Sequence, residues 1–184
     1  MPHSQERWDE YFCRMMILVA SKSKDPNTQH GCVIVGPSHE IRSTGFNGMP
    51  RGIHEEPPCF AKPDKKEIQK RYERPTKYLY FEHSERNAIY NAARTGIALE
   101  GCTLYVTGTP CVDCARGIIQ VGINRVVVYD TSDDGFKERW KDAIVVTEQL
   151  FKEAGVKLDT FKGTINEKDL CVPSLQACAL EDWF

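Results

Sequence analysis

This sequence lacks any apolar run long enough to cross a membrane. Its longest purely apolar runs, such as residues 15–20 and 126–129, fall far short of the roughly 20 residues that a membrane-spanning helix needs. The first residues, MPHSQERWDEYF, also lack the basic stretch followed by an apolar stretch that a secretory signal requires. We therefore expect a protein that makes no membrane contact and resides in the cytoplasm.

The chain also lacks an excess of charge of one sign. It carries 24 basic and 26 acidic residues, which gives a formal net charge of −2. Proteins that coat nucleic acid need a strong positive field, so we do not expect a nucleic-acid partner. With 184 residues, of which 41% are hydrophobic, the chain is long enough for one sizeable core. We predict one domain over residues 1–161 and a tail over residues 162–184.

A disulfide framework is not expected, although the chain has eight cysteines. In a reducing compartment a close pair of cysteines favours metal binding over a bridge, and Cys111 and Cys114 form such a pair. The other six are dispersed, and most have apolar neighbours, so we expect most of them to pack as small hydrophobic side chains. These six are Cys13, Cys32, Cys59, Cys102, Cys171 and Cys178.

Helical and strand-like patterns alternate along most of the chain. Apolar residues spaced by three and four predict a helix over residues 7–22, which Asp25-Pro26-Asn27 would end. Further helices are expected over residues 83–94, 112–121 and 136–154, and strands over residues 32–36, 41–46, 103–107, 125–130 and 156–161. The first two strands are expected to form an antiparallel hairpin. This alternation predicts an α/β sandwich.

Residues 53–80 interrupt the alternation. Four prolines break regular structure there, and basic side chains outnumber acidic ones over residues 62–77. We expect an excursion from the core whose charges are solvated. The tail over residues 162–184 ends in Leu-Glu-Asp-Trp-Phe, which can dock on the body, dock on a neighbouring subunit, or remain loosely ordered.

The functional signal lies in His83, Glu85, Cys111 and Cys114. One imidazole and two thiolates make a three-ligand zinc site whose fourth position is open to water, as in catalytic zinc sites. Zinc lowers the pKa of such a water, which yields a nucleophile for an electron-poor ring carbon. Glu85 can carry the water proton to a ring nitrogen and then to the departing amine. These residues together predict hydrolytic deamination.

The predicted helices would bring these residues together. His83 and Glu85 open one predicted helix. Cys111 and Cys114 open another, preceded by Pro110, which suits a helix start. Unpaired backbone N–H groups at two converging helix N-termini would stabilise the thiolates. Alone, a CxxC pair can be redox-active and a histidine before a helix can be a cap or core residue. The combination of H-x-E with P-C-x-x-C is the signature of zinc deaminases.

The sequence resembles the cytidine deaminase superfamily and, within it, the deoxycytidylate deaminases. Four blocks carry the resemblance in order, over about residues 8–161: WDEYFCRMMILVASKSKDPNTQHGCVIV, GFNGMPRG, HSERNAIYNAARTG and PCVDCARGIIQVGINRVVV. The resemblance implies a three-layer α/β/α sandwich with a mixed five-stranded sheet and one catalytic Zn²⁺. It also implies a homo-oligomer that converts the small-molecule nucleotide dCMP and water to dUMP and ammonia.

The resemblance also suggests residues that contact the nucleotide. Asn47 falls on the position whose amide holds the sugar, although an asparagine before Gly48 can also serve a turn. A cation and short polar groups suited to a monophosphate come from Lys24, Asn27 and Thr28, whose competing role is to end the first helix.

Two further pairs of residues are expected near the site. Phe136 or Trp140 could stack on the pyrimidine, or could belong to the helix core. In relatives with allosteric control, the neighbourhoods of Arg51 and Arg94 help to form a regulatory site at a subunit interface. Both arginines can equally be ordinary solvated side chains.

The sequence departs from the family pattern in places. Ser84 stands where alanine is usual, and its hydroxyl could cap the helix while activity survives. Thr109 replaces a residue that is often bulkier, and the excursion over residues 53–80 does not align with the family. The substrate specificity is therefore open.

Some relatives hold a second, structural zinc near this excursion. Conceivable ligands for it are His54 and Cys59, with Cys32 or His30 as partners. Their spacing does not favour a site, so we predict one zinc ion only.

Three other functions compete with this hypothesis. A tRNA adenosine deaminase uses the same metal and glutamate, and the basic stretch with Tyr72 and Tyr78 could bind its RNA. A deaminase of a free base or nucleoside, of the cytosine, cytidine or guanine type, would need no phosphate ligand such as Lys24. A zinc-stabilised binding module without catalysis is the third, but the presence of Glu85 argues against it.

Overall fold

The computed structural model of the chain describes residues 5–53, 65–129 and 134–165, and its five strands form one mixed sheet. The strands are β1 (Gly31–Val35), β2 (Ile41–Phe46), β3 (Thr103–Thr107), β4 (Arg125–Tyr129) and β5 (Lys157–Thr160). They lie in the order β2-β1-β3-β4-β5, with β1 antiparallel to both of its neighbours and β3, β4 and β5 mutually parallel. The expected hairpin of the first two strands is confirmed.

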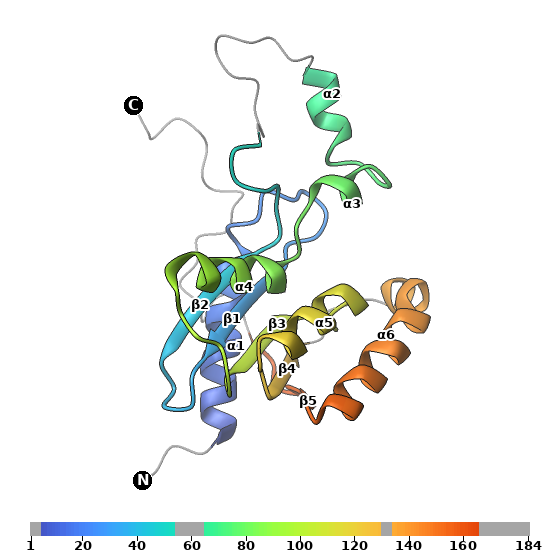
Figure 1. The fold of residues 1–184 in the computed structure, drawn as a ribbon. Coiled ribbons are helices and arrows are strands. Elements are labelled where there is room, and N and C mark those ends of the chain that lie inside the picture. The colour runs from blue at the N-terminus through green and yellow to red at the C-terminus, as the bar shows by residue number, and fades with distance from the viewer. Residues whose placement is uncertain (1–4, 54–64, 130–133, 166–184) are drawn as a thin grey trace.

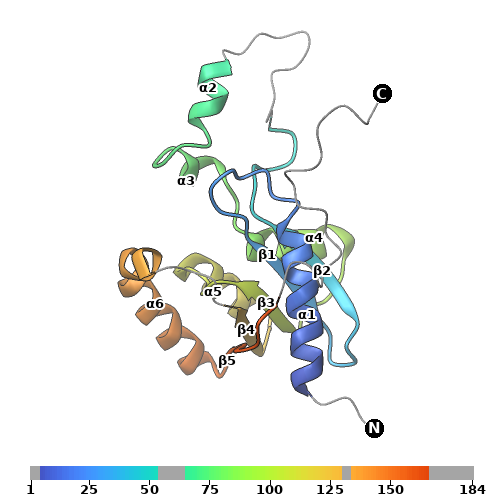
Figure 2. The ribbon, with the colours of Figure 1, turned by 180° about the vertical axis from the view of Figure 1, so that it is seen from behind.

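Helices cover both faces of this sheet, as Figure 1 and the reverse view in Figure 2 show. One face packs against α1 (Gln5–Ala20), and the other carries α4 (Ser84–Thr95), α5 (Val112–Gln120) and α6 (Asp134–Ala154). Two short helices, α2 (Lys65–Lys70) and α3 (Lys77–Tyr80), lie beyond one end of the sheet, next to the start of α4. The predicted three-layer α/β/α sandwich with a mixed five-stranded sheet is confirmed.

The core has two halves because successive side chains of a strand point to opposite faces. On β1, Cys32 and Ile34 pack beneath α4 and α5, whereas Val33 and Val35 pack against α1. The central strands bury both faces, and their sequences are therefore continuous apolar runs rather than alternating ones. The free cysteines Cys13, Cys32 and Cys102 are all buried, as expected.

Most predicted boundaries agree with the structure to within two residues. The largest difference for a strand or helix end is that α1 stops at Ala20, because the chain tightens into a turn whose backbone N–H groups reach back to residues 17–20. At the other end of the sandwich, α4 ends at Gly96, which has a φ of 70°, the left-handed conformation predicted for this cap.

The segment over residues 53–80 is only partly an irregular excursion, because it contains α2 and α3. Sequence periodicity does not detect a helix as short as α3. Tertiary contacts hold it instead: the Lys77 ammonium pairs with the Asp25 carboxylate, and the rings of Tyr72 and Phe81 pack edge to face at 5.9 Å or less. The expectation that the charges of this segment are all solvated is wrong for Lys77, which is 7% exposed.

The beginning of the predicted tail packs on the body of the molecule. Ile165 is buried against the α1 side of the sheet, and its backbone N–H lies 3.4 Å from the Tyr129 hydroxyl. Residues 166–184, for which docking was considered, lie outside the described residues. The extent of the domain over residues 1–161 stays a prediction. Within the described ranges, no helix is long and apolar enough to cross a membrane.

Candidate active site

The three predicted metal ligands meet at one point in the structure. His83 Nδ1 lies 3.5 Å from the sulfur of Cys111 and 3.5 Å from the sulfur of Cys114, and the three atoms lie within 4.8 Å of one another. Tetrahedral zinc with ordinary Zn–N and Zn–S bonds separates nitrogen from sulfur by about 3.6 Å. The donor set and its spacing therefore fit one Zn²⁺ with three protein ligands, which leaves one coordination position for a non-protein group.

Two helix N-termini create this geometry. His83 is the N-cap residue of α4 and Cys111 is the N-cap residue of α5, and neither side chain caps its own helix. Both side chains can therefore point to the metal position. Cys114 lies in the first turn of α5, where unpaired backbone N–H groups favour a thiolate. The predicted convergence of two helix starts is confirmed, with Pro110 one residue ahead of the cap.

Hydrogen bonding sets the proton count of the sulfur pair. Interaction with Cys114, assisted by the His83 ring, lowers the pKa of the Cys111 thiol to about 3 although burial opposes this. The neighbouring Cys111 sulfur and burial raise the pKa of Cys114. Without metal the pair therefore holds one proton. Because zinc binds thiolates, its uptake releases that proton.

Glu85 and Ser84 line the same pocket as the metal ligands. The Glu85 side chain is buried in the first turn of α4, and the Ser84 hydroxyl donates a hydrogen bond of 3.0 Å to its Oε2 atom. The expectation that Ser84 caps α4 is wrong. The cap position belongs to His83, so the Ser84 hydroxyl is free to bond the neighbouring carboxylate instead.

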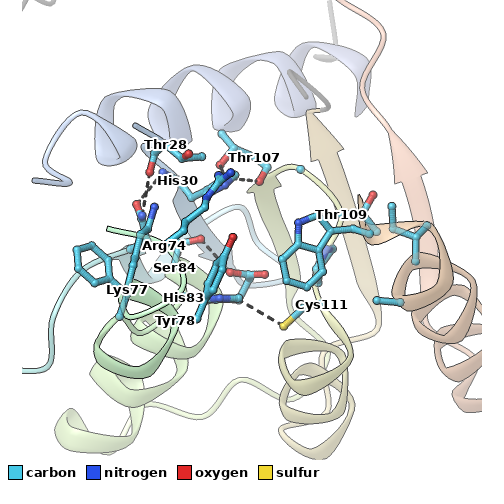
Figure 3. Close-up of a pocket in the computed structure, with 18 residues that line it drawn as sticks. Thr28, His30, Arg74, Lys77, Tyr78, His83, Ser84, Thr107, Thr109 and Cys111 are labelled. Carbon is cyan, nitrogen blue, oxygen red and sulfur yellow. Dashed lines mark hydrogen bonds between the residues drawn. The ribbon is translucent and has the colours of Figure 1, made fainter. Parts of the chain in front are cut away.

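The pocket has an apolar wall and a basic wall, and Figure 3 shows them around the metal ligands. The apolar wall includes Pro110, Trp140, Ala143 and Ile144. The opposite wall comes from the segment just before α4 and includes Arg74, Lys77 and Tyr78. Tyr78 and Trp140 meet across the pocket, with ring centroids 6.2 Å apart and nearly perpendicular planes. Ring stacking and charge recognition can therefore operate in one cavity.

The structure brings only some of the predicted substrate residues to this pocket. Asn47, Thr28 and Trp140 line it. Lys24 and Asn27 do not, and both are exposed, because this loop turns its neighbours Ser23 and Asp25 inward. The side chain of Phe136, the alternative stacking residue, lies outside the described residues.

The two predicted regulatory arginines also lie away from the pocket lining. Arg51 and Arg94 are both exposed. The Arg51 guanidinium donates a hydrogen bond of 2.5 Å to the Oδ1 atom of Asn91 on α4, the helix that also carries Arg94. The structure thus places both arginines at α4, and their regulatory role stays a prediction.

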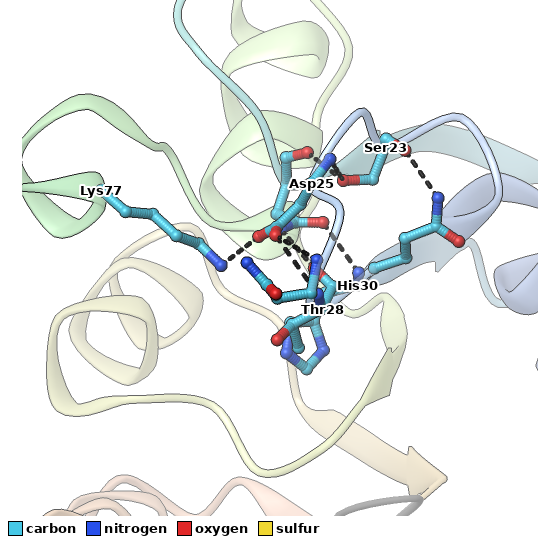
Figure 4. A network of polar contacts seen from close by, with 8 residues as sticks. Ser23, Asp25, Thr28, His30 and Lys77 are labelled. Atoms are coloured by element: carbon cyan, nitrogen blue, oxygen red, sulfur yellow. Dashed lines mark hydrogen bonds and ion pairs between the residues drawn. The ribbon is translucent and has the colours of Figure 1, made fainter. Parts of the chain in front are cut away.

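Sequence reasoning missed Arg74, Lys77 and Asp25 as site residues. Asp25 was interpreted only as part of a helix-ending turn, but its side chain is buried and accepts hydrogen bonds from the backbone N–H groups of Asn27 and Thr28. Its other oxygen, Oδ2, pairs with the Lys77 ammonium (Figure 4). The basic residues before α4 were the available signal, but sequence alone could not identify which of them turns inward.

Asn47 belongs to the same polar network. Its Nδ2 donates to Asp25 Oδ2 at 3.1 Å and to the Thr28 carbonyl at 2.9 Å, and its Oδ1 accepts the His30 backbone N–H at 2.7 Å. Both amide hydrogens are therefore used, whereas Oδ1 retains a second lone pair. This arrangement fixes the orientation of the amide and leaves an acceptor for a hydroxyl.

No second zinc site is found in the part of the chain that the structure describes. There, the cluster of His83, Cys111 and Cys114 is the only group of three or more ligand-type side chains within reach of one ion. Cys32 is fully buried in the apolar core, and His30 Nδ1 lies 2.9 Å from the Thr107 carbonyl oxygen. The other conceivable ligands, His54 and Cys59, lie outside the described residues.

Comparisons with known proteins agree with this chemistry. Residues 6–130 match the family model described as the cytidine and deoxycytidylate deaminase zinc-binding region. The chain is 41% identical over 152 residues to the "Uncharacterized deaminase in luxG 3'region" of Aliivibrio fischeri, covering 83% of this chain and 92% of that protein. It is 38% identical over 154 residues to the deoxycytidylate deaminase of Homo sapiens, covering 84% and 79% of the two chains.

A solved structure supports the fold. The crystal structure of dCMP deaminase from the cyanophage S-TIM5, in complex with dCMP and dUMP, matches with a TM-score of 0.62 and 21% identity over 86% of this chain and 99% of that one. The family model spans more than half of the chain, and the relatives match it over most of their length. The chain therefore belongs to the cytidine and deoxycytidylate deaminase family.

Proposed function

We propose that the chain catalyses the hydrolytic deamination of dCMP, which consumes one water and yields dUMP and ammonia. The observation that carries the proposal is the buried Glu85 carboxylate in one pocket with His83, Cys111 and Cys114. Relatives named deoxycytidylate deaminase, at 35–38% identity in mammals, support the choice of dCMP.

In this mechanism the ligands are His83, Cys111 and Cys114. A zinc ion bound to them supplies Lewis acidity, which makes water a nucleophile near neutral pH. The Glu85 carboxylate accepts the proton of the attacking water and delivers it to N3 of the pyrimidine ring while oxygen bonds to C4. Glu85 then transfers the second proton to the amino group, which leaves as ammonia when the C4–N bond breaks. The Ser84 hydroxyl holds Glu85 Oε2 in place throughout.

Two other side chains orient the nucleotide. The remaining lone pair of Asn47 Oδ1 accepts a hydrogen bond from a sugar hydroxyl. The Trp140 ring stacks on the base, and its perpendicular contact with Tyr78 restricts the orientation of the indole. The second face of the base then lies toward Glu85 and the metal ligands.

We also propose a homo-oligomer that works in a reducing, cytoplasmic environment. Strand β2 is an edge of the sheet, and large apolar side chains are exposed on it and on the adjoining α4. These are Ile41, Phe46 and Tyr90, which are 40%, 42% and 47% exposed. Such an edge favours contact with a second copy, and free thiols in the core suit a reducing compartment. Sedimentation velocity on the protein and on Tyr90→Glu tests the assembly: a monomer in both cases would contradict it.

The decisive experiment measures ammonia release by the zinc-loaded protein on a substrate panel. The panel contains dCMP, CMP, deoxycytidine, cytosine, guanine and an adenosine-containing tRNA anticodon stem. We expect kcat/KM to be highest for dCMP. Preference for an unphosphorylated compound would favour a base or nucleoside deaminase, and preference for the RNA would favour a tRNA adenosine deaminase. Either result would retain the zinc chemistry and reject dCMP as the substrate.

A further inference from the structure

The basic wall of the pocket contains a cation whose charge is not balanced by a carboxylate of the described residues. Two cations of this wall, Arg74 and Lys77, line the cavity. Asp25 neutralises Lys77 through a buried ion pair. Arg74 forms no ion pair with any acidic side chain in the described ranges. Its guanidinium therefore supplies the net positive charge of this wall, at a place that a polar ligand can reach.

The polar network shows where this charge lies relative to the nucleotide. Lys77 Nζ and Asn47 Nδ2 both contact the same atom, Asp25 Oδ2, so the ammonium and the amide are close neighbours (Figure 4). An ammonium has three hydrogen-bond donors, and Asp25 uses one of them. In the proposed function Asn47 binds the sugar. The group attached to the sugar then lies beside Lys77 and the wall that carries Arg74.

We propose that Arg74 and Lys77 form the binding site for the 5′-phosphate and make the enzyme select a nucleotide over a nucleoside. This inference rests on the proposed function and assigns the residues of its phosphate subsite. A phosphate monoester carries close to two negative charges at neutral pH. The planar guanidinium of Arg74 donates two parallel hydrogen bonds to it, and Lys77 adds a point charge that Asp25 holds in position. The Thr28 side chain lines the same cavity and can add a hydroxyl donor.

This assignment replaces Lys24 as the phosphate ligand. Lys24 is exposed and outside the pocket lining, although it lies in the same loop as Thr28 and Asp25. The phosphate-selecting charge thus comes from the segment before α4 and not from the loop after α1. The two assignments make opposite predictions for two surface substitutions.

The test measures ligand binding by calorimetry and turnover by ammonia release. Binding is measured in the zinc-loaded Glu85→Gln background, where the substrate survives, with dCMP and deoxycytidine as the two ligands. Arg74→Ala is expected to weaken dCMP binding roughly 10- to 100-fold, the range for a lost hydrogen bond to a charged group, and to leave deoxycytidine binding unchanged. Arg74→Lys, which keeps the charge but not the fork, is expected to lose less.

Two matched variants complete the design. Lys70→Ala removes an exposed cation from the same segment outside the pocket, and Lys24→Ala removes the cation of the competing assignment. Neither is expected to change the preference for dCMP over deoxycytidine. Thermal unfolding and zinc content establish that each variant is folded and loaded; Arg74 is exposed, so its replacement is expected to be tolerated.

The outcomes separate this inference from the proposed function. Equal losses for both ligands in Arg74→Ala, no loss for either, or loss of the phosphate preference in Lys24→Ala would overturn the assignment while dCMP remains the substrate. If the unsubstituted protein fails to prefer dCMP over deoxycytidine, the proposed function itself is wrong, and the phosphate subsite with it.

Discussion

Glu85 is the side chain on which the proposed proton transfers depend. Replacing it with glutamine keeps its size and its neighbours but removes the basic oxygen. We expect Glu85→Gln to lower kcat by roughly 10²- to 10⁴-fold, the usual contribution of a general acid and base. Zinc content, by atomic absorption, and the unfolding midpoint are expected to stay close to those of the parent. A fully active variant would contradict the mechanism.

Ser84 acts on Glu85 through its hydroxyl. Ser84→Ala removes the 3.0 Å hydrogen bond to Oε2 and leaves the helix cap intact, because His83 occupies the cap position. We expect kcat to fall roughly three- to tenfold, in line with one lost hydrogen bond, with KM unchanged. The control is Ser43→Ala, which deletes another buried hydroxyl that bonds to the α4 backbone, at the Ala88 carbonyl. A larger effect of the control on kcat would show that Ser84 acts only on stability.

At the scale of elements, a polar cluster ties α1 to the sheet. Asp9 on α1 accepts hydrogen bonds of 2.8 and 2.7 Å from the Arg125 guanidinium of β4 and one of 2.8 Å from the Tyr105 hydroxyl of β3. Burial raises the pKa of Asp9, but the hydrogen bonds from Arg125, Gln5 and Tyr105 together hold it below its ordinary value. The ionised carboxylate is therefore bound more strongly in the folded protein.

The low pKa of Asp9 has a consequence for acid stability. A depressed pKa stabilises the fold fully above the unfolded value of about 3.9, and this contribution is lost as pH falls through the folded value. We expect Asp9→Asn to reduce the free energy of unfolding by roughly 3 kcal/mol at pH 7, since it removes one partner of a largely buried ion pair. Urea unfolding at pH 7 and at pH 3 measures the difference, which is expected to shrink at the lower pH. An equal difference at both pH values would contradict this role of the Asp9 charge.

At the scale of the whole molecule, the Lys77–Asp25 ion pair joins the segment before α4 to the loop after α1. Both side chains are almost fully buried. Lys77→Met leaves the Asp25 carboxylate without its counter-charge, and we expect a loss of roughly 3–5 kcal/mol in the free energy of unfolding. The double variant Asp25→Asn with Lys77→Met is expected to recover part of this loss, as measured by urea unfolding. Losses that simply add in the double variant would show that the two side chains do not interact.

The secondary structure and the metal ligands were predictable from sequence because both depend on short-range patterns. The spacing of Trp8, Phe12 and Met16 predicts the buried face of α1, and the apolar run of β4 predicts a strand buried on both faces. His83 and Glu85 are two residues apart, and Cys111 and Cys114 three, so each pair is held by one helix start. The order of these pairs in the chain was enough to predict a zinc site and deamination chemistry.

Which charges face the substrate depended on the tertiary structure. Lys24 and Lys77 are both lysines near polar residues, and nothing in their local sequence shows that the first is exposed and the second buried. Their positions are set by the packing of two segments that lie far apart in the chain and meet at Asp25. The sequence by itself determined the reaction, because its residues are held by local helix geometry. Only the fold decided which cations line the pocket, because burial of a charge depends on a partner supplied by a distant segment.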